Sequence, residues 1–186
     1  MGSNHRERLI QEIFNFQSEY SEEQASKPKF ESLLSNYQNC FERGLLLGHI
    51  TASSWILNYE QNAVLLLHHT KLNKWLQPGG HADGDDDVRS VALKEAEEET
   101  GISGFIFSSN EIFDLDIHTI PERKGVPEHE HYDIRFLLIS PEGAIPQRNH
   151  ESNNLKWIPI EQLYQYVNHE ASLLRMYNKT GKILAE

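Results

Sequence analysis

Three glutamates share one face of a predicted helix with apolar residues. The helix runs from about Asp86 to Thr100, and four apolar residues recur along it at 3.6-residue spacing: Val88, Val91, Ala92 and Ala96. Glu95, Glu98 and Glu99 continue this stripe at positions i, i+3 and i+4. Neighbouring carboxylates repel one another and are costly to bury, so a bound cation would relieve both costs. An all-oxygen ligand set suits a hard divalent ion such as Mg²⁺ or Mn²⁺, and the alternative interpretation is a solvated acidic helix.

The residues around these glutamates resemble the signature of the Nudix hydrolases. That signature reads Gly, five residues, Glu, seven residues, and then Arg-Glu-aliphatic-x-Glu-Glu-x-Gly-aliphatic. Gly80 opens the matching segment, Asp86 takes the first Glu position and Lys94 takes the Arg position. The remaining matched positions are Glu95, Ala96, Glu98, Glu99, Gly101 and Ile102. The preceding run from Trp75 to Gly80 is also similar to the family's usual approach to this segment.

The resemblance implies an α+β fold of the Nudix type, an α/β/α sandwich with a mixed sheet. It also implies hydrolysis of the pyrophosphate linkage in a nucleoside diphosphate joined to another group, with Mg²⁺ or Mn²⁺ as the cofactor. Metal ions screen the charge of a diphosphate and stabilise the leaving phosphate. In this interpretation Glu95, Glu98 and Glu99 hold the metal, and the Gly80 carbonyl is an additional ligand. One of these glutamates, or Glu151 on a later loop, activates the attacking water, and the sequence leaves that choice open.

Two residues depart from the family pattern. Asp86 is one methylene shorter than the expected Glu, and Lys94 replaces an Arg that helps to hold the catalytic helix and loop in the family. A Lys ammonium cannot reproduce the planar hydrogen-bonding fork of a guanidinium. These departures motivate an alternative function, a weakly active or inactive Nudix domain that binds and senses a nucleotide or nucleotide-sugar.

Composition narrows the class of protein. A chain of 186 residues with 38% hydrophobic residues is long enough for one sizeable core, and it contains no apolar run of membrane-spanning length. The net charge of −11 argues against nucleic-acid or anionic-membrane surfaces as partners. The single cysteine, Cys40, excludes an internal disulfide and suits the cytoplasm. The partner that the resemblance implies is a small nucleoside diphosphate derivative.

The periodicity predicts an N-terminal helical extension over residues 1–43 and a Nudix domain over residues 44–186. The extension holds two amphipathic stripes, and the second stripe follows Pro28. We expect these helices to pack on the domain, with a dimerisation arm or a lid over the substrate as alternatives. A homodimer through these helices or through a sheet edge is left open.

Strand patterns follow from Gly48 onward. Strands are predicted over residues 50–58, 63–69, 112–120, 131–140 and 155–157, and helices over residues 160–167 and 171–178, with Gly181 ending the last helix. Strands and helices thus alternate within one domain, which agrees with the fold that the resemblance implies.

Two predicted strands carry polar side chains at alternate positions. The first strand has Asp114, Asp116 and His118, and the later strand has His129, His131, Asp133 and Arg135. If these strands pair, the two polar rows meet on one face, where Arg135 would pair with Asp114 or Asp116.

This polar face has three interpretations. It is a solvated sheet face, or it is the wall of a substrate pocket in which His118, His131 and Asp133 contact phosphate, base or a further metal. In the third, His118, His129 and His131 form a nitrogen-rich site for zinc or another transition metal. His81 directly follows Gly80, so we also expect it to touch a ligand near the metal loop. His49 is interpreted as a hydrogen-bonded structural histidine. The substrate, the number of metals and the oligomeric state are not encoded in any pattern we recognise.

Overall fold

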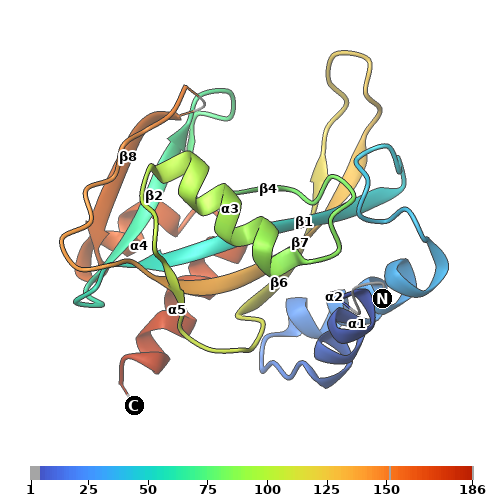
Figure 1. Cartoon of the computed structure of the whole chain (residues 1–186), viewed down its shortest axis with the longest axis horizontal. Coiled ribbons are helices and arrows are strands. Elements are labelled where there is room, and N and C mark those ends of the chain that lie inside the picture. The colour runs from blue at the N-terminus through green and yellow to red at the C-terminus, as the bar shows by residue number, and fades with distance from the viewer. Residues whose placement is uncertain (1–4, 151, 186) are drawn as a thin grey trace. The chain divides into compact units, whose positions relative to one another are not determined.

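The computed structural model describes residues 5–150 and 152–185, which form five helices and one mixed sheet of eight strands. The helices are α1 (His5–Asn15), α2 (Ser21–Asn36), α3 (Val88–Thr100), α4 (Ile160–Val167) and α5 (Ala171–Ile183). The strands are β1 (Gly48–Leu57), β2 (Ala63–His69), β3 (Lys74–Leu76), β4 (Gly79–His81), β5 (Ile106–Phe107), β6 (Asp114–Ile120), β7 (His129–Ile139) and β8 (Ser152–Pro159). The expected α+β fold with a mixed sheet is confirmed, and α1 and α2 precede it in the chain (Figure 1).

The chain divides into two compact units. The first unit contains Met1–Ser53, Gly80–Ala92 and Glu111–Phe136, and the second contains Ser54–Gly79, Leu93–Asn110 and Leu137–Glu186. In the sheet the strand order is β3-β2-β1-β7-β5, while β4 pairs with β1, β6 with β7 and β8 with β2. Strands β1 and β7 and helix α3 each contribute residues to both units. The predicted division at residues 43 and 44 stays a prediction.

In the first unit, helix α2 packs on α1 and on β6. Glu23 is fully buried, and its carboxylate accepts the backbone N–H of Leu115 in β6 at 3.0 Å. The ring of Phe30 meets that of Tyr132 edge-on, with 5.2 Å between the ring centroids. The guanidinium of Arg6 donates to the carbonyl oxygens of the last turn of α2 and the residues beyond it, at Leu34, Tyr37 and Gln38. These contacts tie the two N-terminal helices together and to the sheet of this unit.

In the second unit, β2 is a central strand. It pairs antiparallel with β3, β8 and the end of β1, and its residues from Ala63 to Leu67 are all buried. A continuous apolar run is expected of a strand that is covered on both faces. The core around it consists of Ile56, Leu65, Ala96, Ile102, Phe105 and Leu138. Ala96 and Ile102 belong to the acidic motif, so the apolar side of that motif is fixed in a core.

Two predicted helix boundaries were wrong. Pro28 lies inside α2 and does not precede it, because the buried Phe30, Leu33 and Leu34 continue a helix that began at Ser21. Gly181 lies inside α5 and does not end it, since the helix continues to Ile183. A single glycine costs a helix only about 1 kcal/mol, and packing of the buried face of α5 outweighs that cost. None of the helices in the described residues has the length and apolar character needed to cross a bilayer.

Candidate functional site

The two ends of helix α3 are set by its flanking residues. Within the first unit, the Asp87 carboxylate accepts the backbone N–H of Ser90 at 3.3 Å, which is the bond of an N-terminal cap, and α3 begins at the next residue, Val88. Within the second unit, Gly101 follows the helix at a φ of +67°, which is a conformation that favours glycine. Its N–H still donates to the Glu97 carbonyl at 2.9 Å. The signature glycine is therefore the C-terminal cap of the helix.

The three candidate glutamates lie in the last turns of α3, within the second unit. Glu99 is 7% exposed, and its carboxylate accepts the backbone N–H of Gly79 at 2.9 Å. Glu95 is half-buried, whereas Glu98 is exposed. Glu97 instead faces the loop after the helix, where its carboxylate accepts the Gly104 N–H at 3.2 Å. Glu97 therefore lies on a different side of the helix from the three candidate glutamates.

The three carboxylates are a donor set of the kind that a hard divalent ion requires. They bring three oxygen-donor groups within one and a half turns of helix, and the burial of Glu99 would raise its electrostatic attraction for a cation. Among the described residues, no choice of one oxygen from each of these three carboxylates places all three within 4.8 Å of one another. Like charges repel, so the three carboxylates are expected to lie apart until a cation binds between them.

Lys94 lies on the exposed side of α3. Its Nζ is 3.8 Å from the Glu98 carboxylate, and both side chains are more than half exposed. The loop before residue 151 lies along the end of the same helix, because the Gln147 N–H donates to the Thr100 carbonyl and the Asn149 side-chain amide donates to the Glu98 carbonyl. Glu151 itself, which was predicted as a candidate base, lies outside the described residues.

Two further signature positions belong to the first unit. Gly80 is half-buried in β4. The Asp86 carboxylate accepts the backbone N–H of Arg6, at the start of α1, at 3.3 Å. The shorter acidic residue at this position is therefore used in a contact with the N-terminal helix. The catalytic and metal-binding roles of all these signature residues stay predictions.

Five imidazoles gather in the first unit, around His131 in β7. The ring centroid of His131 lies 4.9 Å from that of His49 in β1 and 4.9 Å from that of His81 in β4. It lies 5.3 Å from that of His129 in β7 and 5.5 Å from that of His118 in β6. In the pairing of β6 with β7, His118 stands directly opposite His131. The predicted meeting of the two polar rows is confirmed.

Three imidazoles of this cluster are held neutral. Burial, with the neighbouring imidazoles adding to it, lowers the pKa of His131 to about 2. Burial, followed by the charge of Arg43, lowers the pKa of His81 to about 4. The pKa of His49 is also lowered, chiefly by burial. A neutral imidazole keeps a lone pair on one ring nitrogen, which is the form that binds a metal.

The other half of the polar face is an ion network around Arg135. Its guanidinium, which is 3% exposed, donates to Asp133 at 2.7 Å, to Asp116 at 3.1 Å and to Asp114 at 3.2 Å. Burial alone would lower the pKa of Arg135, but the carboxylates of Asp133, Asp116 and Asp114 raise it. The hydroxyl groups of Thr51 and Ser53 in β1 also donate to Asp133. The predicted pairing of Arg135 with Asp114 and Asp116 is confirmed.

The histidine cluster and the Arg135 network bear on the roles predicted for five residues. Asp133 was expected to contact ligand; its carboxylate accepts hydrogen bonds from Arg135, Thr51 and Ser53, and its ligand role stays a prediction. The roles of His81, His118 and His131 as ligand contacts stay predictions too. His49 was interpreted as an ordinary structural histidine, and its place beside His131 was missed. The pattern that would have found it is the polar row His49, Thr51 and Ser53 at alternate positions of one strand.

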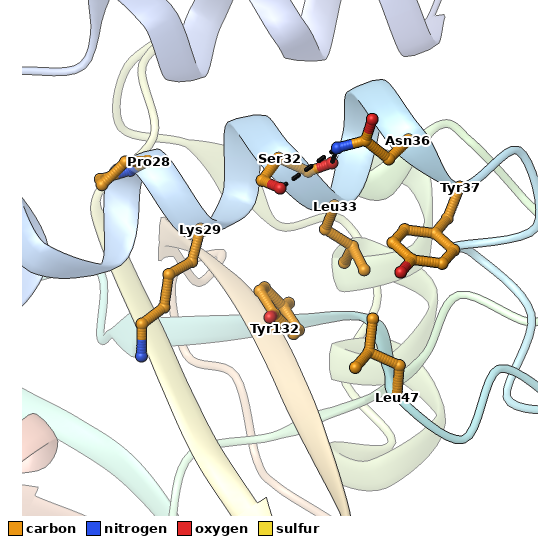
Figure 2. A pocket seen from close by; sticks show the side chains of 8 residues that line it. All are labelled: Pro28, Lys29, Ser32, Leu33, Asn36, Tyr37, Leu47 and Tyr132. Atoms are coloured by element: carbon orange, nitrogen blue, oxygen red, sulfur yellow. Dashed lines mark hydrogen bonds between the residues drawn. The ribbon is translucent and has the colours of Figure 1, made fainter.

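A separate pocket of about 370 Å³ lies in the first unit, along helix α2 (Figure 2). Figure 2 shows Leu33 from the helix, Leu47 from the segment before β1 and Tyr132 from β7 around it, with Lys29 at one side. None of the candidate catalytic or metal-binding residues that the structure describes lines this pocket. It is therefore not the place where the predicted chemistry would occur.

Comparison with known proteins agrees with the motif. A sequence model of the NUDIX domain matches residues 48–179. A relative from Lactococcus lactis subsp. cremoris (strain MG1363), described as a probable DHNTP pyrophosphohydrolase, is 29% identical over 106 residues, which are 56% of this chain and 61% of the relative. The match thus spans less than two thirds of that relative's length.

Two solved structures resemble the chain in fold. A C. elegans Ap4A hydrolase in a binary complex has a TM-score of 0.58 at 22% identity, covering 73% of this chain and 97% of its own. The NUDIX domain of Shewanella oneidensis NrtR, solved with ADP ribose, has a TM-score of 0.51 at 18% identity, covering 82% of this chain and 97% of its own. At these identities the likeness concerns the fold alone. Because the domain match takes in more than half of the residues, the chain belongs to the NUDIX domain family.

Proposed function

We propose that the protein is a metal-dependent hydrolase that cleaves the pyrophosphate linkage of a nucleoside diphosphate derivative. The observation that carries the proposal is the set of Glu95, Glu98 and Glu99 on one face of α3, with the buried Glu99 held by the Gly79 N–H. The family generally uses divalent metals. Bound to these carboxylates, Mg²⁺ or Mn²⁺ would screen the phosphate charges and stabilise charge on the leaving phosphate.

The other roles in the reaction, metal binding and activation of water, are assigned to residues of the chain as follows. The bond from the Gly79 N–H to Glu99 fixes that carboxylate, so it suits a metal ligand more than a mobile base. Glu98 is exposed and near Lys94, which would lower the cost of its negative charge. We keep Glu98 and Glu151 as candidates for the base that takes a proton from water, and the Gly80 carbonyl as a further metal ligand.

The relatives support the reaction class and leave the substrate open. The curated relative is named for DHNTP pyrophosphate hydrolysis and the C. elegans structure for Ap4A hydrolysis, so both names describe cleavage in polyphosphate compounds. The shared chemistry is attack of water on a phosphate next to an anhydride oxygen. We therefore expect a substrate that joins a nucleoside-like group to a di- or polyphosphate.

Three glutamine variants test the assignment. Glu98→Gln and Glu99→Gln remove a proposed metal-binding carboxylate, and turnover with Mg²⁺ or Mn²⁺ should fall on the order of 100-fold, because metal stabilisation contributes several kcal/mol. Glu97→Gln is the matched control, since it removes the same charge from the same helix but lies against Gly104. The assay is product release from a panel of nucleoside triphosphates, dinucleoside polyphosphates, nucleotide sugars and ADP-ribose. Equal activity of Glu98→Gln and Glu97→Gln would refute the site.

A sensing domain is the second candidate. It is favoured by one observation: the ion pair that Lys94 makes within the described part of the chain is with the exposed Glu98 at 3.8 Å, where the family signature has an arginine fork. This function predicts saturable binding of a nucleotide or nucleotide-sugar without product under any metal. Metal-dependent product release from the same panel would decide against it.

A further inference from the structure

We propose that His49, His129 and His131 form a binding site for one divalent transition-metal ion, with Zn²⁺ as the expected occupant. Each residue offers one ligand atom, and the three atoms lie within 4.8 Å of one another. All three residues belong to the first unit, and their donors are nitrogens, whereas the glutamates of α3 offer only oxygens. The proposal is therefore independent of the proposed hydrolase function.

Hydrogen bonds set the tautomers of two of these imidazoles. His49 Nδ1 is 3.3 Å from the Leu45 carbonyl oxygen, and His129 Nδ1 is 2.8 Å from the Pro127 carbonyl oxygen. A carbonyl oxygen only accepts, so each Nδ1 must be the protonated nitrogen that donates. The lone pair of each ring then lies on Nε2. Metal-binding histidines commonly donate their other N–H to a backbone carbonyl in this way.

Two of the nitrogens that would face the metal have no hydrogen-bond partner among the described residues. Nε2 of His49 and Nε2 of His131 are buried and have no hydrogen-bond partner there. A buried polar atom without a partner costs about 1–3 kcal/mol. A solvated sheet face, the alternative for these histidines, would not carry this cost. A metal ion would use both lone pairs at once.

The geometry allows closure around an ion with small side-chain movements. Zinc binds imidazole nitrogen at about 2.0–2.1 Å, which places two nitrogens of a tetrahedral site about 3.4 Å apart. The three ligand atoms lie within 4.8 Å of one another, so closure requires each pair to approach by at most about 1.4 Å. His129 and His131 are only half-buried, so their rings have room to turn.

The ligand types favour a transition metal over Mg²⁺. Imidazole nitrogen suits Zn²⁺, Cu²⁺, Ni²⁺ and Fe²⁺, whereas Mg²⁺ prefers oxygen. Three histidines leave a fourth tetrahedral position for water or a further ligand. His81 is the neighbouring candidate for it, because its ring centroid lies 5.2 Å from that of His49 and 4.9 Å from that of His131. The lowered pKa of His131 keeps that ring neutral, in agreement with the geometry.

Direct metal binding to the full-length chain tests the proposal. The protein, free of any affinity tag, is stripped with chelator and dialysed, and Zn²⁺ binding is measured by calorimetry and by metal analysis after gel filtration. We expect one equivalent of Zn²⁺ and a melting temperature raised by its binding. Co²⁺ should give the visible absorption of a tetrahedral nitrogen site. Absence of a stoichiometric site in the folded chain would overturn the proposal.

Two ligand variants and two controls complete the test. His131→Ala and the more exposed His129→Ala should each weaken Zn²⁺ binding by at least roughly 100-fold, since even residues that only support a ligand affect metal affinity 10–100-fold. His169→Ala, an exposed histidine of the second unit, and Glu98→Gln should bind Zn²⁺ as the parent chain does. Circular dichroism checks that each variant is folded. If His131→Ala does not fold, the result for His129→Ala decides the test. Undiminished binding in His129→Ala, or its loss in Glu98→Gln, would refute the site.

Discussion

Replacing Arg135 with methionine should destabilise the protein strongly. Methionine keeps most of the length and apolar surface of the side chain but removes the charge. In the folded protein Arg135 pairs with three aspartates, of which Asp114 is fully buried and Asp133 is 2% exposed. The substitution would leave these buried carboxylates without their cation, while the hydroxyl groups of Thr51 and Ser53 still donate to Asp133.

The expected magnitude follows from that burial. Removing one partner of a buried ion pair costs about 3–5 kcal/mol, because the other charge remains in a site of low dielectric constant. For a chain of this length about 1 kcal/mol lowers the melting temperature by roughly 2–4 °C, so a fall of roughly 6–20 °C is expected. Arg135→Lys keeps the charge but cannot reach three carboxylates with one ammonium, so its loss should be intermediate.

Arg43→Met is the matched control for this experiment. Arg43 also pairs with an aspartate, Asp83, but the two side chains are 61% and 49% exposed. An exposed pair is worth about 0–1 kcal/mol. Urea denaturation of both variants gives the free energy of unfolding, and Asp133→Asn in the Arg135→Met background measures the coupling. If Arg135→Met costs no more than Arg43→Met, or if the cycle shows no coupling, the reasoning from burial is wrong.

Two further predictions concern the second unit. Gly101→Ala should lower the free energy of unfolding by roughly 1–3 kcal/mol because of its φ of +67°, and by more because its new Cβ would lie 2.9 Å from the Gln147 Cβ. Gly104→Ala is the control for the conformational cost alone, since Gly104 has a φ of +84° and nothing within 4 Å of the added Cβ. Equal melting temperatures of the two variants would contradict the predicted clash. Thr180→Ala should lower the free energy of unfolding, measured by urea denaturation, by about 1–3 kcal/mol. It removes the hydroxyl that accepts the buried Trp55 indole N–H at 2.9 Å. Thr180→Ser keeps that bond and should lose less.

The parts of the fold that the sequence predicted are those with a local period. Strand β2 and helix α4 have the predicted bounds, because a run of buried apolar residues and an amphipathic turn are each visible over a few neighbours. The strands β3, β4 and β5 were missed, since two or three residues are too few to display a period. Their positions are determined by pairing with distant strands.

In the candidate site, too, contacts between neighbours in the sequence were predictable and contacts between distant segments were not. The glutamates of α3 are neighbours in the chain, so helical spacing alone placed Glu95, Glu98 and Glu99 on one face. The opposition of His118 and His131 was also predictable, because it needs only the antiparallel pairing of two successive strands. His49 and His81 join them from strands that lie far away in the sequence, and nothing in their own neighbourhoods encodes that meeting.

This difference bears on which metal chemistry a sequence motif can reveal. A motif on one helix fixes the direction of its carboxylates, but long, charged side chains spread apart when no cation is bound. The pKa values of His49, His81 and His131 are lowered, so these rings are uncharged at neutral pH and the strands that carry them can pack them against one another. The bond from His49 to the Leu45 carbonyl fixes its ring before any ion arrives. The described residues accordingly bring together the nitrogens of His49, His129 and His131 more closely than the oxygens of the signature glutamates. The site with the clearest motif is thus the less preorganised one, and the site with no motif is the more preorganised one.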